Sequence, residues 1–376
     1  MPGPTLADVL PSVAGALGVP LHPAPAFALP PAQSAVVVLV DGLGDRLLER
    51  RGGHAPFLRS VRASGTATAV DCGFPSTTAT SMGTFGTARP PGSHGLVGTE
   101  VLDPVLDAVF SELAWDPRVD PRQWQPGSTV FEDAAAAGLP SVMVGPPWFD
   151  GSGLTVAALR GARFVAAGPL EDRVDAALAA LAAQPRVLVY LYWGEVDKVG
   201  HVHGCESWEW GQEVERVDGE LARLARSVPA DVLVVVTADH GMVDVPHAER
   251  VDLAEEPALR QGVRHVGGDP RALQVYCEPG RAAQVAGVWQ ERLAGLADVL
   301  HRDDVVARGW FGPVAQHVLP RIGDLVAVAT SRTAIVDSAT TRPELLRLLG
   351  QHGARTPEEM LVPVLAVLGT RRPRRR

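Results

Sequence analysis

The amino-acid sequence predicts an α/β protein in which a doubly wound, mostly parallel sheet is flanked by helices and carries an inserted small α+β cap subdomain. Two observations predict this class. Short, continuous apolar runs recur along the chain, and helical patterns lie between them. Continuous apolar runs are typical of strands that are buried on both faces, as in a parallel sheet covered by helices.

The apolar runs are rich in β-branched residues, and the first of them ends at a turn-forming Asp-Gly pair. We expect strands at 35–40 (AVVVLV), 141–144 (SVMV), 187–192 (VLVYLY), 232–237 (VLVVVT) and 325–329 (LVAVA). The last run has the same continuous apolar character as the others, so we assign it to the core sheet.

Two helices are expected between these strands, at 173–183 and 206–227. The first segment is rich in Ala and Leu, which favour helices. The second has apolar residues at helical spacing, so one face is expected to pack on the sheet while the acidic residues are solvated. That apolar face consists of Val214, Val217, Leu221 and Leu224.

Composition divides the chain into regions. The N-terminal residues are rich in Pro and Ala and predict a lead-in with one short helix, whereas mixed charge with several Gly and Pro precedes the last predicted strand. We expect a lead-in at 1–34, a core formed by 35–250 and 323–370, an inserted cap at 251–322 and a basic tail at 371–376.

Charge and cysteine content exclude several classes of protein. The net charge is -9, whereas a nucleic-acid-binding module normally carries a basic face. Three scattered cysteines are too few for a disulfide framework, and the N-terminal residues contain neither a signal peptide nor an apolar run long enough for a membrane span. We therefore expect a cytoplasmic protein whose partner is a small molecule.

Acidic residues follow three of the predicted strands. Asp41 follows the first strand directly, Asp197 and then His201 follow the third, and the Asp239-His240 pair follows the fourth. Any one of them alone would ordinarily be a turn residue or a helix N-cap. In open α/β sheets, however, the carboxyl ends of the strands line the binding crevice, so the combination indicates a site.

The same residues suit a pair of metal ions. Asp197 and His201 are four residues apart, which places them on one side of a helix as two ligands of one ion. A mixed imidazole and carboxylate set favours zinc, with manganese or another transition metal as the alternative. Two-metal sites, with ions about 3.5–4 Å apart, catalyse in-line phosphoryl transfer.

A cluster of hydroxyl residues in the stretch 71–83 (DCGFPSTTATSMG) supplies candidate nucleophiles. Taken alone, such a cluster indicates a loop and a helix N-cap. Beside two divalent cations, however, a hydroxyl can attack without a histidine base, because the cations lower its pKa. The candidates are Ser76, Thr77, Thr78, Thr80 and Ser81.

Together these motifs resemble the alkaline phosphatase superfamily, and within it the nucleotide pyrophosphatase/phosphodiesterase branch. The resemblance spans residues 36–363 and implies an alkaline phosphatase-like core. It also implies a metal-dependent hydrolase of phosphoric esters, phosphodiesters in particular. The matching segments are VVVLVDGLG (36–44), FPSTT (74–78), GTARPPGSHGLVG (86–98), YWGEVDKVGHVHG (192–204), VTADHGM (236–242) and GQHGARTPEEMLVP (350–363).

The resemblance also implies a role for each site residue. It identifies Thr78 as the nucleophile, which becomes a phospho-threonine during the reaction, and it implies two metal ions. One ion is bound by Asp41, Thr78, Asp239 and His240, and the other by Asp197, His201 and His352.

Two features of this assignment rest on weaker signals. The late histidine follows from the resemblance alone, because the sequence itself would equally allow His265, His301 or His317. Ala79 and Ser81 stand where we expect the branch to carry an aromatic residue and an Asn that binds a phosphoryl oxygen. Ser81, or backbone amides alone, would then make that contact.

Other activities stay open at this point. A phosphomonoesterase or phosphonate hydrolase would need a cation against the substrate dianion, whereas a phosphodiesterase needs an apolar wall for a second substituent. A phosphoryl transferase and a catalytically silent metal-binding or interaction protein are further alternatives. The candidate cations are Arg89, Arg271 and Lys198, and the candidate wall residues are Trp148, Trp193, Trp208 and Trp210.

Overall fold

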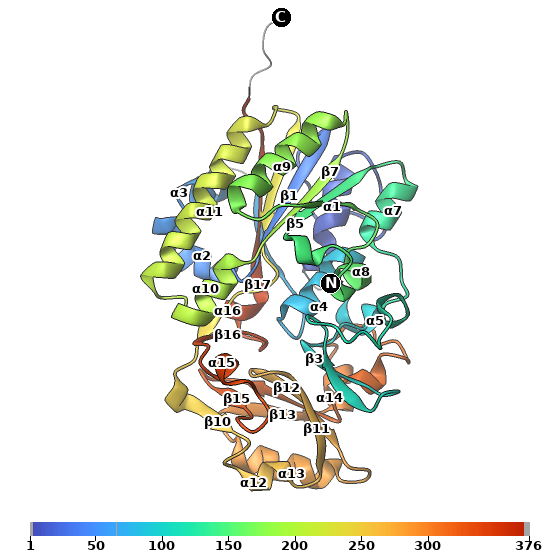
Figure 1. The fold of residues 1–376 in the computed structure, drawn as a ribbon, viewed down its shortest axis with the longest axis vertical. Helices are drawn as coiled ribbons and strands as arrows, with labels where there is room; N and C mark the ends of the chain where they lie inside the picture. The colour runs from blue at the N-terminus through green and yellow to red at the C-terminus, as the bar shows by residue number, and fades with distance from the viewer. Residues whose placement is uncertain (1–2, 65, 372–376) are drawn as a thin grey trace, which may run out of the picture.

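Two main β-sheets organise the chain in the computed structural model, which describes residues 3–64 and 66–371 (Figure 1). The larger sheet has seven strands in the order β2-β17-β8-β1-β7-β5-β6. Its strands are β1 (Ser34–Val40), β2 (Thr66–Asp71), β5 (Ser141–Gly145), β6 (Arg163–Ala166), β7 (Leu188–Trp193), β8 (Val232–Thr237) and β17 (Leu361–Leu368).

The larger sheet is mostly parallel. β1 lies between β7 and β8 and is parallel to both, with Val40 opposite Trp193 and Leu39 opposite Thr237. Only β17 runs antiparallel to its neighbours, β2 and β8. Every residue of β1 and β8 is buried, because helices cover both faces of the sheet. The predicted fold class is therefore confirmed.

The helices form two layers around this sheet (Figure 1). One layer contains α3 (Pro56–Ser64), α9 (Leu170–Ala183) and α11 (Trp208–Ser227), and the other contains α1 (Val9–Ala16), α4 (Thr78–Thr87) and α7 (Val130–Ala136). The helices predicted at 173–183 and 206–227 are thus present as α9 and α11. All four residues of the predicted apolar face of α11 are buried.

The smaller sheet has six strands in the order β13-β14-β12-β11-β3-β4. Helix α13 (Ala282–Arg292) contacts its edge strand β13. The strands are β3 (Glu100–Asp103), β4 (Ala108–Ser111), β11 (Val263–Asp269), β12 (Ala272–Cys277), β13 (Ala297–His301) and β14 (Leu325–Ala329).

The remaining elements are short. The strands β9 (Val243–Asp244), β10 (Arg250–Asp252), β15 (Ala334–Val336) and β16 (Gly350–Gln351) form two small ribbons, in which β10 pairs with β15 and β16 with β9. The other α-helices are α2 (Asp45–Arg50), α5 (Pro91–His94), α6 (Pro121–Trp124), α8 (Gly153–Ala158), α10 (Glu195–His203), α12 (Pro257–Arg260), α14 (Arg302–Ala307), α15 (Pro343–Leu346) and α16 (Pro357–Met360).

One strand lies in the wrong sheet in our prediction. The apolar run 325–329 is a strand, β14, but it pairs antiparallel with β12 and β13 in the smaller sheet. Val326 and Val328 belong to the main hydrophobic core, whereas Leu325 and Ala327 belong to a second core beneath α13. A strand between two cores is apolar on both faces, so its sequence reads like that of a buried parallel strand.

The smaller sheet also draws on more of the chain than the predicted insertion 251–322. β3 and β4 come from the N-terminal half, and β14 follows the insertion. The sheet is therefore assembled from two separate segments, 100–111 and 263–329, and the second extends past the predicted insertion. At the other end of the molecule, Arg371 forms a bridge with Pro229, and the rest of the predicted basic tail, 372–376, lies outside the described residues.

Glycines allow the carboxyl ends of the core strands to approach closely. Gly42 has φ 71°, and a Cβ atom added there would lie 2.8 Å from the Cβ of Asp197. Gly44 has φ 50°, and a Cβ added there would lie 2.6 Å from the Cα of Gly241. Larger residues at these positions would push the segments after β1, β7 and β8 apart.

The helices also bear on the prediction that the chain has no membrane span. Within residues 3–64 and 66–371, no helix combines the length and the apolar character that crossing a bilayer requires.

Candidate active site

A fully buried group of possible metal ligands lies at the ends of β1 and β8. It consists of Asp41, Asp239 and His240, whose ligand atoms all lie within 4.8 Å of one another. His240 Nε2 is 3.4 Å from Asp41 Oδ1 and 3.4 Å from Asp239 Oδ2. We call this set the strand-end group, because adjacent strands deliver its members.

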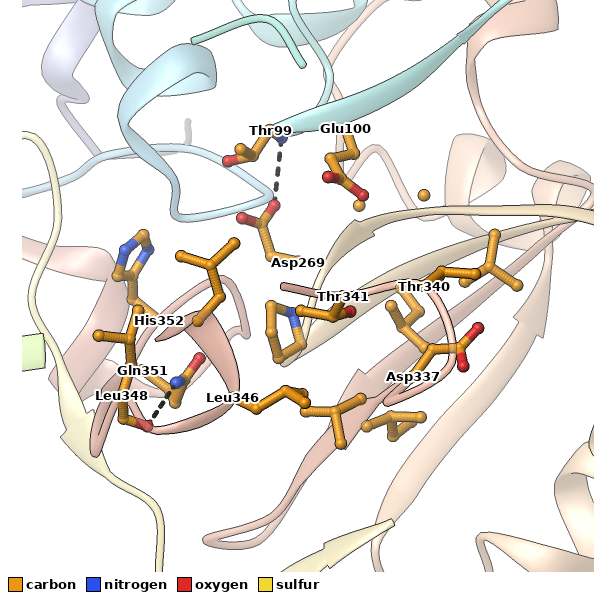
Figure 2. A pocket seen from close by; sticks show the side chains of 18 of the residues that line it. Thr99, Glu100, Asp269, Asp337, Thr340, Thr341, Leu346, Leu348, Gln351 and His352 are labelled. Carbon is orange, nitrogen blue, oxygen red and sulfur yellow. Dashed lines mark hydrogen bonds between the residues drawn. The ribbon is translucent and has the colours of Figure 1, made fainter. Parts of the chain in front are cut away.

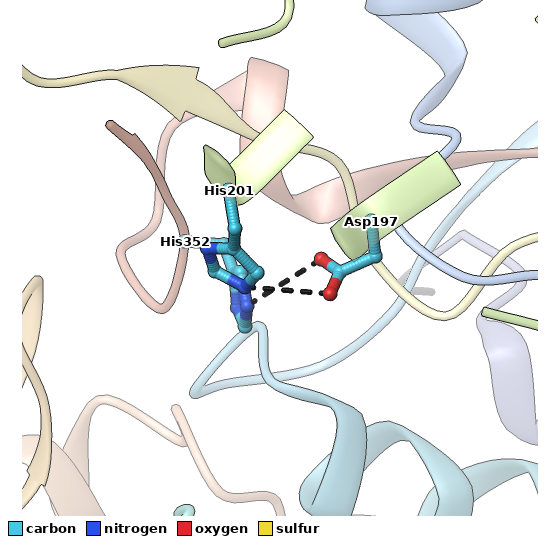
Figure 3. Close-up of side chains that lie close together, drawn as sticks. All are labelled: Asp197, His201 and His352. Atoms are coloured by element: carbon cyan, nitrogen blue, oxygen red, sulfur yellow. Dashed lines mark ion pairs between the residues drawn. The ribbon is translucent and has the colours of Figure 1, made fainter. Parts of the chain in front are cut away.

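A second group lies beside the first and is partly exposed. Asp197 and His201 are one turn apart on α10, and His352 comes from the loop between β16 and α16. Both imidazoles face the Asp197 carboxylate, with Nε2–O distances of 3.3 Å from His201 and 3.9 Å from His352 (Figure 3). We call this set the helix–loop group.

The two groups form one site. The rings of His240 and His352 stack with their centroids 3.7 Å apart, and the ring of His201 lies 5.2 Å from that of His352. Thr78 joins them, since its Oγ1 lies 3.1 Å from His240 Nε2. The structure therefore brings together Thr78 and all six side chains predicted to bind metal with it, across more than 300 residues of sequence.

The chemistry of the two groups fits divalent cations. Asp41 Oδ1, Asp197 Oδ1 and Asp239 Oδ2 are buried atoms without a hydrogen-bond partner among the described residues. Burial, and then the negative charges of Asp239 and Asp197, raise the pKa of Asp41 well above its ordinary value. Unpaired buried carboxylate oxygens are costly, and bound cations would compensate them.

The histidines are oriented as metal ligands. In each ring Nδ1 faces a backbone carbonyl, which leaves Nε2 for a cation. Burial and the neighbouring imidazoles lower the pKa of His352, so the ring is held in the neutral form that binds metal. The Nδ1–O distances are 2.7 Å from His201 to Gly350, 3.0 Å from His240 to Gly241 and 3.0 Å from His352 to Ser76.

Thr78 is the first residue of α4, with Thr77 in extended conformation before it. Ser76, one residue earlier, fixes this turn to the loop that carries His352. Its hydroxyl donates to the Ala354 carbonyl at 2.7 Å, and its backbone N–H donates to the Gly353 carbonyl at 3.2 Å. The Thr78 hydroxyl is thus held where α4 begins and where unpaired backbone N–H groups are available.

The remaining hydroxyl residues of the cluster, Thr77, Thr80 and Ser81, are buried within the protein. The hydroxyls of Thr77 and Thr80 are 3.2 Å apart and bond to each other. Ser81, the predicted phosphoryl-oxygen contact, lies inside α4 with its side chain fully buried, near the Cys72 thiol. It is not one of the residues that line the cavities described next.

Two cavities open at Thr78. The cap-side cavity, of about 280 Å³, lies between the core and the smaller sheet (Figure 2). The aromatic cavity, of about 470 Å³, is lined by Trp148, Phe149 and Tyr192. Thr78, Asp197 and Leu113 line both cavities. A substrate at Thr78 therefore has room for one substituent in each cavity.

The four tryptophans considered as an apolar wall differ in position. Trp148 lines the aromatic cavity with 74% of its surface exposed. Trp193 and Trp210 are buried in the core, and Trp208 is exposed at the start of α11. Trp148 is the one of the four that can contact a ligand at Thr78.

None of the three candidate cations lines either cavity. Arg271 is buried against Glu359, with bonds of 2.7 and 2.8 Å. Lys198 is exposed beside Glu195, and Arg89 lies near Ser128. Among the described lining residues of both cavities there is no Lys or Arg at all.

Three residues near the site escaped the sequence analysis. Tyr192 donates a short hydrogen bond to Asp41, and its place at the carboxyl end of β7 was a signal that could have revealed it. Thr99 and Asp269 line the cap-side cavity, where the Thr99 N–H donates to the Asp269 carboxylate at 3.2 Å. Thr99 directly precedes β3, and Asp269 is the last residue of β11. Neither lies in a sequence motif that would have indicated a site.

Known proteins share this fold. The murine ectonucleotide pyrophosphatase/phosphodiesterase 5 has a TM-score of 0.72 at 22% identity, and the match covers 90% of this chain and 88% of that one. A second structure of the murine protein is an inactive threonine-to-alanine variant in complex with AMP. Phosphonoacetate hydrolase from Sinorhizobium meliloti, in complex with phosphonoacetate, has a TM-score of 0.69 at 19% identity and 91% coverage of both chains.

Sequence comparison finds curated relatives that are much longer. The human ectonucleotide pyrophosphatase/phosphodiesterase family member 1 is 27% identical over 228 residues, which are 57% of this chain and 24% of the relative. Human family member 7 is 35% identical over 77 residues, 19% of this chain and 17% of the relative. This chain therefore matches about a quarter or less of the length of each.

The family assignment rests on a longer match. The profile of the family described as "Type I phosphodiesterase / nucleotide pyrophosphatase" matches residues 35–355, most of the chain and both groups of possible metal ligands. The resemblance stated from the sequence motifs is confirmed: the chain belongs to the type I phosphodiesterase/nucleotide pyrophosphatase family.

Proposed function

We propose that the chain is a divalent-metal-dependent phosphodiesterase that acts through a phospho-threonine formed on Thr78. One observation carries the proposal: the Thr78 hydroxyl lies against the strand-end group, and Thr78 lines two different cavities. A nucleophile in this position can attack a phosphorus atom that carries a substituent in each cavity.

Two zinc-class ions are expected at the site. The strand-end group together with Thr78 would hold one, and the helix–loop group would hold the other. When bound, such ions neutralise the charge of the phosphoryl oxygens and activate the nucleophile. The mixed imidazole and carboxylate donors support zinc over magnesium or calcium.

The residues of the chain carry out the displacement in two steps. Thr78 gives its hydroxyl proton to solvent and Oγ1 forms a bond to phosphorus, as the bond to the leaving alcohol breaks on the opposite side and that alcohol takes up a proton. Water then attacks the phospho-threonine in line, the bond between phosphorus and Oγ1 breaks, and a phosphate monoester is released as the hydroxyl is restored. The N-terminus of α4 supports both steps, because its free N–H groups and dipole favour the negative charge that develops on phosphorus.

The cavities favour a diester over a monoester or a phosphonate. A phosphate monoester dianion, or the carboxylate of a phosphonate such as phosphonoacetate, needs a cationic side chain for its extra charge. The described lining residues supply none, whereas both cavities have apolar walls. The murine structural neighbour binds AMP, a phosphate monoester, which supports a phosphate ester as ligand in general; the preference for a diester rests on the cavity linings.

The direct test compares bis-p-nitrophenyl phosphate with p-nitrophenyl phosphate on the zinc-loaded protein. We expect the diester to have the higher kcat/KM, and a quenched reaction to contain phosphate on Thr78 by mass spectrometry. Preference for the monoester would favour the phosphomonoesterase alternative. Absence of bound zinc together with absence of any esterase activity would favour a catalytically silent protein.

A further inference from the structure

The cap-side cavity has a charge pattern that restricts the substrate further. We infer that this cavity takes an uncharged or cationic alcohol substituent of a phosphodiester and rejects a substituent with further negative charge. Substrates of this chain would then be simple diesters, and nucleoside polyphosphates would be excluded. The inference rests on the proposed function and names the substrate class of the same site.

Carboxylates, and no cations, face the cavity. Glu100 and Asp269 lie near one another on the side of β3 and β11, and Asp337 lies across the cavity from them (Figure 2). Asp269 is buried, and its partner there is the Thr99 N–H. Burial raises the pKa of Asp269 to about 6, so the group is mostly ionised at neutral pH.

The helix–loop group (Asp197, His201 and His352) and Gln351 also line the cavity, and the remaining lining residues are apolar or carry hydroxyls. Thr99, Thr340 and Thr341 offer hydroxyl groups that can bond to a neutral or cationic substituent. The apolar wall consists of Leu253, Leu273, Ile335, Leu346 and Leu348. Such a surface suits the carbon skeleton of an alcohol and gives no compensation to an anion.

Two arginines close to the lining residues, Arg271 and Arg260, are already engaged. Arg271 makes a bidentate pair with Glu359 and donates to the carbonyls of Ser331 and Thr333. Arg260 pairs with Asp337 but is not a lining residue, so it partly neutralises one carboxylate without offering a site for an anion.

Arg250 is engaged in the same way. Its guanidinium donates to the carbonyls of Val245, Leu346 and Leu348, so it supports the cavity wall through the backbone. A second phosphate group in the cavity would therefore face carboxylates, with no Lys or Arg among the described lining residues to balance them. Like charges placed together in this way exclude the wrong ligand.

The experiment uses three p-nitrophenyl phosphodiesters whose second alcohol carries no charge, a positive charge or a negative charge. The alcohols are ethanol, choline and 3-hydroxypropanoate, and ATP is included as a polyphosphate. With the zinc-loaded protein we expect kcat/KM for the carboxylate ester to be at least about 10-fold below that of the ethyl ester. The choline ester should equal or exceed the ethyl ester, and ATP should be a poor substrate.

Charge variants locate the effect in the cap-side cavity. Glu100→Gln should narrow the gap between the ethyl and carboxylate esters, and Glu100→Arg should narrow it further or reverse it. Glu100 is exposed at the cavity, so these changes leave the core intact. The matched control is Glu291→Gln, an exposed carboxylate on α13 outside both linings, which should leave all ratios unchanged.

The outcomes separate the inference from the proposed function. Equal turnover of the ethyl and carboxylate esters, or efficient hydrolysis of ATP, would overturn the inference alone. A gap that persists unchanged in Glu100→Arg would overturn the assignment to the cap-side cavity. Failure to hydrolyse even the ethyl ester and bis-p-nitrophenyl phosphate would overturn the proposed function, and the inference with it.

Discussion

The strand-end group and the helix–loop group have similar ligands but are built in different ways. Asp41 and Asp239 follow adjacent parallel strands, so the register of β1 with β8 fixes their separation. Asp197 and His201 share a helix, but His352 arrives on a loop from a distant part of the chain. The strands of the core sheet deliver the first group, whose His240 ring also stacks on His352, whereas the second group depends on how that loop docks.

A buried ion pair docks the loop. Glu359 accepts two bonds from Arg271 of the smaller sheet, and it also accepts bonds from the Ala354 N–H at 3.0 Å and the Thr356 hydroxyl at 2.6 Å. Arg271 and Glu359 have almost no exposed surface. The smaller sheet therefore holds the helix–loop group in place. Mutations should for this reason be able to weaken zinc binding by one group and leave zinc binding by the other unchanged.

The largest expected effect is a loss of activity that leaves the residues of both metal-binding groups unchanged. Thr78→Ala removes the nucleophile and should lower kcat by roughly 1,000-fold or more, while zinc content stays close to that of the unmodified protein. The measurements are turnover of bis-p-nitrophenyl phosphate and elemental analysis. The control is Thr87→Ala, at the other end of α4, which should keep most activity. Full activity in Thr78→Ala would remove that residue from the mechanism.

A single substitution in either group should remove the zinc ion of that group only. Asp239→Ala should abolish zinc binding to the strand-end group, and His352→Ala should abolish it in the helix–loop group. In the unmodified protein, dialysis against increasing chelator should release zinc in two steps, first from the partly exposed helix–loop group. The two steps require that the zinc affinities of the two groups in the unmodified protein differ by about 10-fold or more. Each variant should lack the step that belongs to its altered group. Loss of both steps in both variants would contradict independent groups.

Breaking the ion pair should affect one group. Arg271→Met leaves Glu359 buried and unpaired, which should cost about 3–5 kcal/mol of stability and weaken zinc binding by the helix–loop group. The double variant Arg271→Met with Glu359→Gln should recover part of the thermal stability but not the zinc affinity. The matched control is Arg216→Met, whose pair with Glu171 is exposed and should contribute under about 1 kcal/mol. Equal losses in both groups would show that the pair stabilises the fold only.

The smallest effect is expected for a change beside the strand-end group. Tyr192→Phe removes the hydrogen bond to Asp41 and should weaken zinc binding by the strand-end group about 10-fold, the lower end of outer-shell effects. Competition with a chromogenic chelator measures this change. Zinc affinity of the helix–loop group should stay the same, and a change confined to that group would contradict the assignment of Tyr192.

The sequence predicted what the core strands determine locally. Asp41, Asp197 and Asp239 could be identified because each follows an apolar run, and parallel strands end at one edge. His352 required the family resemblance, because its place depends on the docking of a loop. Glu100 and Asp269 could not be found, because only the pairing of β3 with β11 brings them together.

The position of β17 has a consequence for synthesis of the chain on the ribosome. This last strand inserts between β8 and β2, two strands that are made long before it. Until residue 368 has emerged, the nascent chain therefore presents an unpaired edge of β8, and β2 lacks its neighbour. Such open edges favour association with other chains. We expect proteins truncated before β17 to aggregate, whatever the state of their metal ligands.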